Sequence, residues 1–109
     1  MDYIYLASPY SHPNADVREA RVAAAMTTAA DLMREGLVVF SPIAHSHPIA
    51  ENHAMPGDWT FWEAQDLPLL HHAAELYVLT LDGWDQSRGV CAEIAYARGI
   101  GKPVTYIAP

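Results

Sequence analysis

The chain has 109 residues, 51% of them hydrophobic and 17% charged, a composition that suits one compact globular domain over residues 1–109. Thirteen acidic residues against six Lys and Arg give a net charge of −7, which argues against a nucleic-acid polymer or an anionic membrane surface as partner. The single cysteine, Cys91, excludes an intrachain disulfide, and without a membrane-length apolar run or a secretory leader we expect a soluble, cytoplasmic protein.

The first part of the chain predicts a strand, a helix and a second strand. Residues 3–7 form a short apolar, aromatic run that is typical of a buried strand. Asn14 is placed to cap a helix that continues to about residue 35, where Gly36 ends it. Residues 37–40 read as the second strand, and strand–helix–strand order implies parallel pairing with a right-handed crossover. The helix has four residues at the spacing of one apolar face: Val22, Met26, Ala29 and Met33.

The second part begins with residues 41–57, which we predict to be a long loop because they contain three prolines and three histidines. Asp58 is expected to cap a helical stretch, and Pro68 predicts that this helix ends or bends near Asp66, or that Asp66 caps a new one. Residues 76–81 and 101–107 carry two further strands, with a helix capped by Ser87 between them. Alternating strands and helices predict a three-layer α/β domain with a parallel sheet of four to five strands.

Ligands of such sheets bind beyond the carboxyl ends of the strands, which are here residues 8–10, 41–47 and 82–89. Arg88 is either a solvated residue of the helix or, because it lies beside the free amides of the helix start, a contact for a phosphate. Asp85 is explained most simply as a turn residue beside Gly83. The candidate substrate contacts at this edge are Ser8, Pro9, Tyr10, His45, His47, Asp85, Ser87, Arg88 and Gly89.

Glu93 follows Ser87 by six residues, roughly 9 Å along a helix, on a face that should point inward. A buried carboxylate is either paired at the core edge or chemically employed, and both interpretations stay open. A ligand with its phosphate or 5′-hydroxyl at the helix start would present a sugar carbon to Glu93. Displacement at an anomeric carbon also needs a proton donor near the leaving group, for which Asp66 is the candidate. Tyr5 is either a core aromatic residue or the group whose hydroxyl orients Glu93.

The histidines allow an alternative based on a metal. His45, His47 and His53, with Glu51, offer enough donors for zinc, but a His-x-His motif without a fixed third ligand is weak. We therefore expect no metal and no cofactor. The tryptophans at positions 59, 62 and 84 are explained most simply as core or interface residues, and stacking of one of them on a flat base is the alternative.

Several motifs resemble the nucleoside 2-deoxyribosyltransferase-like superfamily. The run Tyr-Ile-Tyr-Leu-Ala-Ser-Pro-Tyr at residues 3–10 resembles its first strand and loop. The pattern Asp-x-Ser-x-Gly-Val-x-x-Glu at residues 85–93, preceded by Asp66-Leu67, resembles its second half. The run Ser-Pro-Ile-Ala-His-Ser-His-Pro at residues 41–48 is most similar to the DUF1937 branch. The superfamily includes deoxyribosyltransferases and nucleoside 5′-monophosphate N-glycosidases.

This resemblance implies a flavodoxin-like fold, a nucleoside or nucleotide substrate, and a homodimer or higher homo-oligomer. It implies that Glu93 is the nucleophile, that Asp66 assists the departing base, and that Tyr5 orients Glu93. Ser87 and Gly89 match the phosphate-binding helix start of the monophosphate hydrolases. Since the transferases use C-terminal residues of a neighbouring subunit and this chain ends soon after its last strand, a hydrolase is favoured over a transferase. The alternatives are a nucleotide-binding module without catalysis and a metal-dependent hydrolase built on the histidines.

Overall fold

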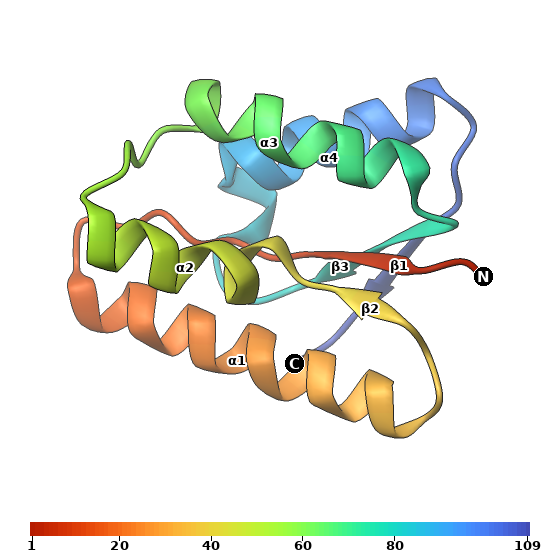
Figure 1. Cartoon of the computed structure of the whole chain (residues 1–109), viewed down its shortest axis with the longest axis horizontal. Helices are drawn as coiled ribbons and strands as arrows, with labels where there is room; N and C mark the ends of the chain where they lie inside the picture. Colours follow the sequence, from red (N-terminus) through yellow and green to blue (C-terminus); the bar gives the residue numbers. More distant parts are fainter.

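A computed structural model describes residues 1–109 and has the predicted three-layer, flavodoxin-like α/β architecture (Figure 1). A four-stranded sheet forms the middle layer, and helices cover both of its faces. The elements are, in chain order, β1 (Ile4–Ala7), α1 (Ala15–Arg34), β2 (Val39–Phe40), α2 (Pro42–His53), α3 (Trp59–His72), β3 (Glu75–Leu79), the short 3₁₀ helix η1 (Trp84–Gln86), α4 (Arg88–Gly99) and β4 (Val104–Ile107).

The sheet has the strand order β2-β1-β3-β4, and all three pairings are parallel. From β1 the chain passes to β2 on one side and then returns to β3 on the other side. The connection after β1 therefore leads to α1 on one face of the sheet, and the connection after β3 leads to α4 on the other face. This leaves a crevice between them at the carboxyl ends of β1 and β3. Tyr5 pairs with Leu76 in this central pair of strands.

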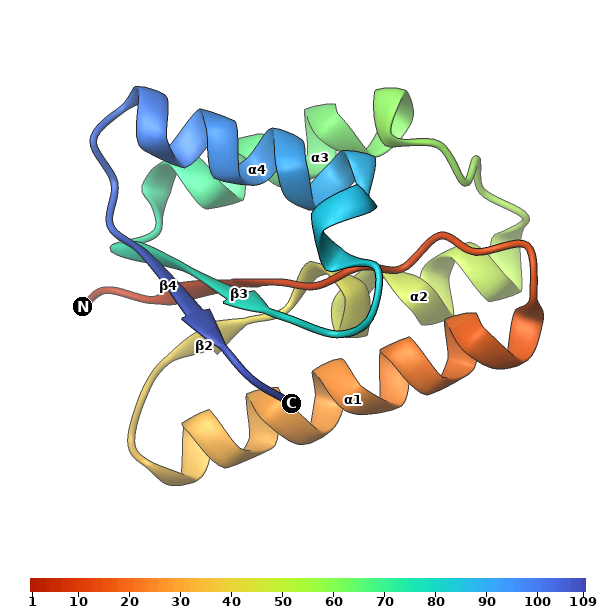
Figure 2. The ribbon, with the colours of Figure 1, turned by 180° about the vertical axis from the view of Figure 1, so that it is seen from behind.

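The helical layers follow from the alternation of side chains along β1. Tyr5 and Ala7 pack in a hydrophobic cluster with residues of α3, β3 and α4, whereas Leu6 packs with Ala29 of α1 on the other face. Figure 1 shows α3 and α4 on one side of the sheet and α1 on the other, with α2 beside α1. The view from behind brings α4 and the edge strand β4 to the front (Figure 2).

The prediction of a loop over residues 41–57 is wrong, because most of this segment is helix α2. Ser41 caps it by accepting a hydrogen bond from the amide of Ala44 at 3.2 Å, and Pro42 occupies the first turn, where a proline nitrogen needs no hydrogen bond. Pro48 lies inside the helix and removes one backbone bond there. The helix ends at Ala54, which has the left-handed conformation typical of a C-terminal cap.

The predicted break near Pro68 is also wrong. Helix α3 runs without interruption from Trp59 to His72, so Asp66 lies inside a helix and caps nothing. Pro68 costs the helix one hydrogen bond, which packing of the buried Leu70 against the hydrophobic cluster offsets. Asp58 does precede the helix, but its side chain makes no capping hydrogen bond.

The other predicted helix boundaries are confirmed, but the predicted apolar face of α1 is wrong for its two methionines. Asn14 caps α1, and Gly36 follows it with a φ of 92°. The buried side of α1 consists of Val22, Ala25 and Ala29, whereas Met26 and Met33 are 56% and 52% exposed. Small alanines let the helix lie close to the sheet, and this turns the methionines outward.

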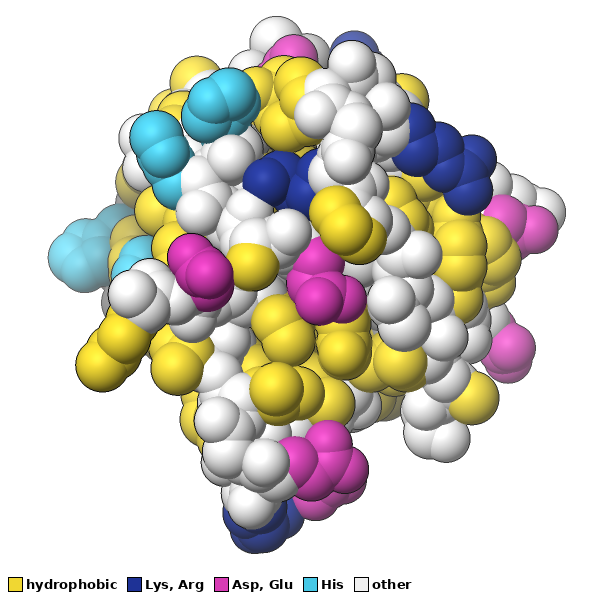
Figure 3. All heavy atoms as spheres, turned by 90° about the vertical axis from the view of Figure 1, so that its right-hand side faces the viewer, with side chains coloured by type: hydrophobic (Ala, Val, Ile, Leu, Met, Phe, Trp, Pro, Cys, Tyr) yellow, Lys and Arg dark blue, Asp and Glu magenta, His cyan; other side chains and the backbone are white.

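The strands are shorter than predicted, since β2 has only two residues and β3 ends at Leu79. None of the helices is long and apolar enough to cross a membrane. Figure 3 shows the end of the molecule opposite the crevice, where hydrophobic, acidic, basic and histidine side chains are mixed over the surface.

Candidate functional site

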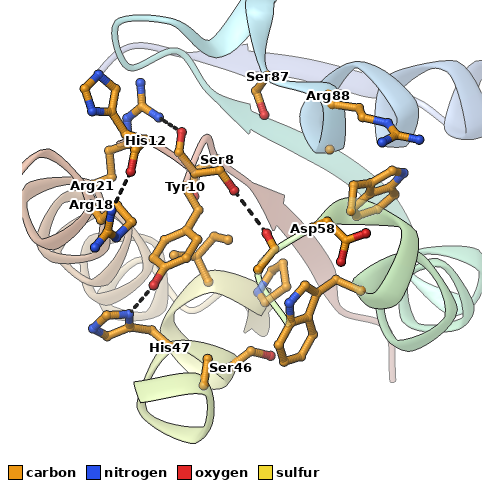
Figure 4. A pocket seen from close by; sticks show the side chains of 18 of the residues that line it. Ser8, Tyr10, His12, Arg18, Arg21, Ser46, His47, Asp58, Ser87 and Arg88 are labelled. Carbon is orange, nitrogen blue, oxygen red and sulfur yellow. Dashed lines mark hydrogen bonds between the residues drawn. The ribbon is translucent and has the colours of Figure 1, made fainter. Parts of the chain in front are cut away.

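A cleft of about 960 Å³ opens at the carboxyl ends of β1 and β3 (Figure 4). Its walls come from the loop after β1, from α2 and the segment that joins it to α3, from α3, and from the start of α4. The cleft brings together eight of the residues that the sequence indicated, although they come from four separate segments of the chain. These residues are Ser8, Tyr10, His47, Asp66, Ser87, Arg88, Gly89 and Glu93.

Four other predicted residues do not line the cleft. Tyr5 lies fully buried beneath it, and Pro9 is buried beside Ser8. The exposed His45 packs its ring near that of Phe40, with 5.6 Å between the ring centroids. Asp85 is an exposed residue of η1 whose backbone oxygen accepts a hydrogen bond from the Cys91 thiol at 3.3 Å. Asp85 therefore makes its contact through its backbone, which fits its interpretation as a turn residue.

The centre of the site is a buried pair formed by Tyr5 and Glu93. The hydroxyl of Tyr5 donates a hydrogen bond to Oε2 of Glu93, although the two residues are 88 positions apart in the chain. Glu93 is 4% exposed, and this burial raises the pKa of its carboxyl to about 8. The bond from Tyr5 acts in the opposite direction, because it stabilises the carboxylate, and the nearby Asp66 raises the pKa further.

Asp66 faces the same space from α3, whereas Glu93 reaches it from α4. Asp66 is 7% exposed, and desolvation raises the pKa of its carboxyl to about 6. Between about pH 6 and 8 the two carboxyl groups therefore hold roughly one proton between them. Two carboxyl groups that share a proton in one cleft are a suitable arrangement for acid–base and nucleophilic chemistry.

The raised pKa of Glu93 predicts a specific dependence of stability on pH. Below about pH 4.5 Glu93 is neutral in both the folded and unfolded chain, and above that pH only the unfolded chain gains by ionisation, until the folded pKa of about 8 is passed. Glu93→Gln should therefore raise the free energy of unfolding by an amount that grows through this window, by up to about 1.4 kcal/mol per pH unit, and then stays constant.

Urea unfolding of both proteins at a series of pH values measures this difference directly. Because Asp66 is present in both proteins, its own titration largely cancels in the comparison. A constant difference between pH 5 and 8 would mean that Glu93 is already ionised in the folded chain.

The start of α4 forms the upper wall of the cleft in Figure 4. Ser87 caps the helix by accepting a hydrogen bond from the amide of Val90 at 3.3 Å, and the other N–H groups of the first turn have no partner within the helix. A Cβ atom added to Gly89 would lie 3.2 Å from the ring of Trp59, so the close packing of this tryptophan favours glycine. Free N–H groups at the start of a helix favour an anion as ligand.

Ser8 contributes an unused hydrogen-bonding group to the same cleft. Its hydroxyl oxygen is buried and has no hydrogen-bond partner in the chain, and the residue is 4% exposed. Buried polar groups in proteins are nearly always satisfied. Ser8 is therefore a candidate ligand contact in the cleft.

Two arginines of α1 also line the cleft, and the sequence-based prediction did not include them. Arg21 donates to the backbone oxygens of Ser11 and Asp82, at 2.9 and 3.0 Å, and so joins the loop after β1 to the loop before η1. Arg18 donates to the backbone oxygens of His12 and Pro13. The only available signal was the spacing of these arginines, three residues apart at the start of a helix.

The histidines do not form the metal site that was considered as an alternative. His45, His47 and His53 lie on helix α2, and only His47 belongs to a group of possible metal ligands, together with Glu19 and Glu51. The ligand atoms of this group lie within 4.8 Å of one another. Nε2 of His47 is 3.2 Å from Glu19, while Nδ1 contacts the hydroxyl of Tyr10 at 2.8 Å. The contact between His47 and Glu19 is an ion pair when His47 is protonated. Glu19 does not line the cleft.

Over residues 2–108 the chain matches the protein family described as Domain of unknown function (DUF1937). The chain belongs to the DUF1937 family. A solved structure similar to this DUF1937 protein is that of a 2-deoxyribosyltransferase from the psychrotolerant bacterium Bacillus psychrosaccharolyticus, with 27% sequence identity and a TM-score of 0.61. The similarity covers 98% of the DUF1937 chain and 72% of the transferase chain. No curated protein sequence gives a significant match.

These findings confirm the relationship that the motifs indicated. The DUF1937 chain is related to nucleoside deoxyribosyltransferases in sequence and in fold. The Bacillus enzyme is described as a biocatalyst for the synthesis of antiviral and antitumoral nucleosides.

Proposed function

We propose that this protein cleaves or exchanges the N-glycosidic bond of a nucleoside or nucleoside 5′-monophosphate, with Glu93 as the nucleophile. The observation that carries the proposal is the buried Glu93, held by the hydroxyl of Tyr5 and facing Asp66 across one cleft. The similarity to a 2-deoxyribosyltransferase supports a nucleoside as the substrate.

In the first step the carboxylate of Glu93 attacks C1′ of the sugar. The bond from C1′ to the base nitrogen breaks as the new C1′–O bond forms, and the electron pair of the broken bond goes to the base. Asp66 donates its proton to the departing base, so the base leaves in its neutral form. Tyr5 keeps the attacking oxygen in position through its hydrogen bond to Glu93.

In the second step an acceptor attacks C1′ from the side that the base has left, and the bond to Glu93 breaks. Asp66, now ionised, takes the proton of the acceptor, which returns both carboxyl groups to their starting states. If the acceptor is water the products are the free base and the sugar. If the acceptor is a second base the product is a new nucleoside.

The reaction needs Glu93 ionised and Asp66 protonated, whereas burial gives Glu93 the higher pKa of the two. The reactive form is therefore the less populated one. Positive charge that develops on the sugar ring during bond breaking lies beside Glu93 and stabilises its carboxylate. The ionised form of Glu93 is therefore stabilised more strongly as bond breaking proceeds.

Water is the acceptor that we propose, because Ser87 and Gly89 resemble the phosphate-binding helix start of the monophosphate hydrolases. The unpaired hydroxyl of Ser8 and the start of α4 would bind polar groups of the sugar or its 5′-phosphate. Assembly into a homodimer also belongs to the proposal, and light scattering of the purified protein measures it.

The decisive experiment is a screen of ribo- and 2′-deoxyribonucleosides and their 5′-monophosphates for released base by liquid chromatography. Each compound is incubated with and without a second, different base as acceptor. Free base without acceptor is the expected result and indicates hydrolysis, whereas a new nucleoside formed only with acceptor indicates transfer. Tight binding of a nucleotide with no base released would contradict the proposal and favour a binding module.

A further inference from the structure

The face of α3 that lines the cleft carries aromatic side chains next to Asp66. Trp59, Trp62 and Asp66 line the cleft together and follow one another at intervals of three and four residues. Such spacing puts all three on one side of a helix. Trp62 precedes Asp66 by four residues, which is about 6 Å along the axis.

Trp62 is held in one orientation. Its Nε1 donates to the backbone oxygen of Pro56 at 2.7 Å, and the ring of Phe61 packs edge-on against it, with 5.0 Å between centroids and an angle of 84°. Trp59 is different, because its ring packs against Gly89 at the start of α4. Trp62 is therefore the tryptophan of this face that is positioned to contact a ligand.

Helix α2 supplies the opposite wall. Ile43, Ser46 and Ala50 line the cleft at the spacing of one helix face, and His47 and Glu51 of the same helix line it as well. Figure 4 shows Ser46 and Ser87 on opposite sides of the cleft. The cleft thus has tryptophans and the buried Asp66 on its α3 wall, and both apolar and polar side chains on its α2 wall.

We propose that Trp62 stacks on the base of the substrate and that this part of the cleft selects purines. The inference rests on the proposed function in one respect, because it takes Asp66 as the group that meets the leaving base. A base whose nitrogen contacts Asp66 extends along α3 toward the next turn, where Trp62 lies. The cleft, at about 960 Å³, has room for a two-ring base, and a purine overlaps an indole ring more than a pyrimidine does.

Binding of free bases tests this inference without any turnover. Adenine, guanine and hypoxanthine are compared with cytosine, uracil and thymine by equilibrium dialysis, and 2-deoxyribose 5-phosphate serves as the ligand without a base. We expect purines to bind more tightly than pyrimidines. Trp62→Leu should weaken purine binding by about tenfold or more, and Trp62→Phe, which keeps an aromatic ring, should recover most of the loss.

Tryptophan fluorescence gives a second readout. Purines should quench the wild-type emission, and Trp62→Phe should lose most of this quenching even though it still binds. Trp84→Phe is the matched control, because Trp84 lies outside the cleft and packs against Tyr106. That control should bind purines as the wild type does, and its circular dichroism, compared with that of Trp62→Leu, reports whether each variant folds.

Three results would overturn the inference: equal or tighter binding of pyrimidines, unchanged purine binding by a folded Trp62→Leu, or no binding of any base at millimolar concentration. Failure of the proposed function looks different. Purine binding that depends on Trp62, with no base released from any nucleoside, would reject catalysis and keep the inference. Base release by Trp62→Leu at the wild-type rate would keep the proposed catalysis and reject the role of Trp62.

Discussion

Glu93→Gln is expected to lower the rate of base release by about a thousandfold or more while the protein stays folded. Glutamine has nearly the same shape and can still accept the hydrogen bond from Tyr5, so the buried site keeps its packing. An amide oxygen cannot form the bond to C1′ that the first step requires. The measurement is the initial rate of base release on the best substrate of the screen.

Glu35→Gln is the control for loss of an acid, because Glu35 is exposed at the end of α1. It should release base at the wild-type rate. A covalent sugar adduct on Glu93, found by mass spectrometry of rapidly quenched wild-type enzyme and absent from Glu93→Gln, would support the same conclusion. Substantial turnover by a correctly folded Glu93→Gln would reject Glu93 as the nucleophile.

Asp66→Asn should have the second largest effect, a loss of about 10²- to 10⁴-fold in the rate of base release, because asparagine cannot protonate the departing base. The loss should depend on the leaving group. It should be largest for ordinary bases and much smaller for a nucleoside whose base is electron-poor and leaves without protonation.

This dependence separates an acid from a residue that only shapes the site. Equilibrium dialysis of the substrate should show little change in affinity for Asp66→Asn, since the side chain remains polar and of similar size. An equal loss with good and poor leaving groups would mean that Asp66 acts on the geometry of the cleft and not on proton transfer.

The sequence predicted the elements whose signals are local. Asn14, Gly36 and Ser87 mark helix ends by the chemistry of single residues, and each lies where expected. Helix α2 was missed because Pro42 and Pro48 are strong signals for a loop, although a proline in the first turn is harmless and one in the interior removes a single bond. Pro68 misled the interpretation of Asp66 in the same way.

The candidate site could be predicted only in part, for a related reason. Its residues lie at the ends of parallel strands, which the order of elements fixes, so Ser8, Ser87 and Glu93 were found. The contact from Tyr5 to Glu93 joins positions 88 residues apart; the place of Tyr5 on a central strand left it open, and the family resemblance favoured it. The wall formed by α2 depends on how that helix packs, and the sequence carries no local signal for such packing.

Arg21 has a consequence for how the cleft can open. Its guanidinium group binds backbone oxygens of the loop after β1 and of the loop before η1, so neither loop can swing away without breaking bonds to the other. The loop after β1 is also joined to the opposite side, because Tyr10 contacts His47 of α2 at 2.8 Å and the hydroxyl of Ser11 donates to the backbone oxygen of Gly57 at 3.4 Å. Displacing this loop would therefore break hydrogen bonds on both sides of the cleft.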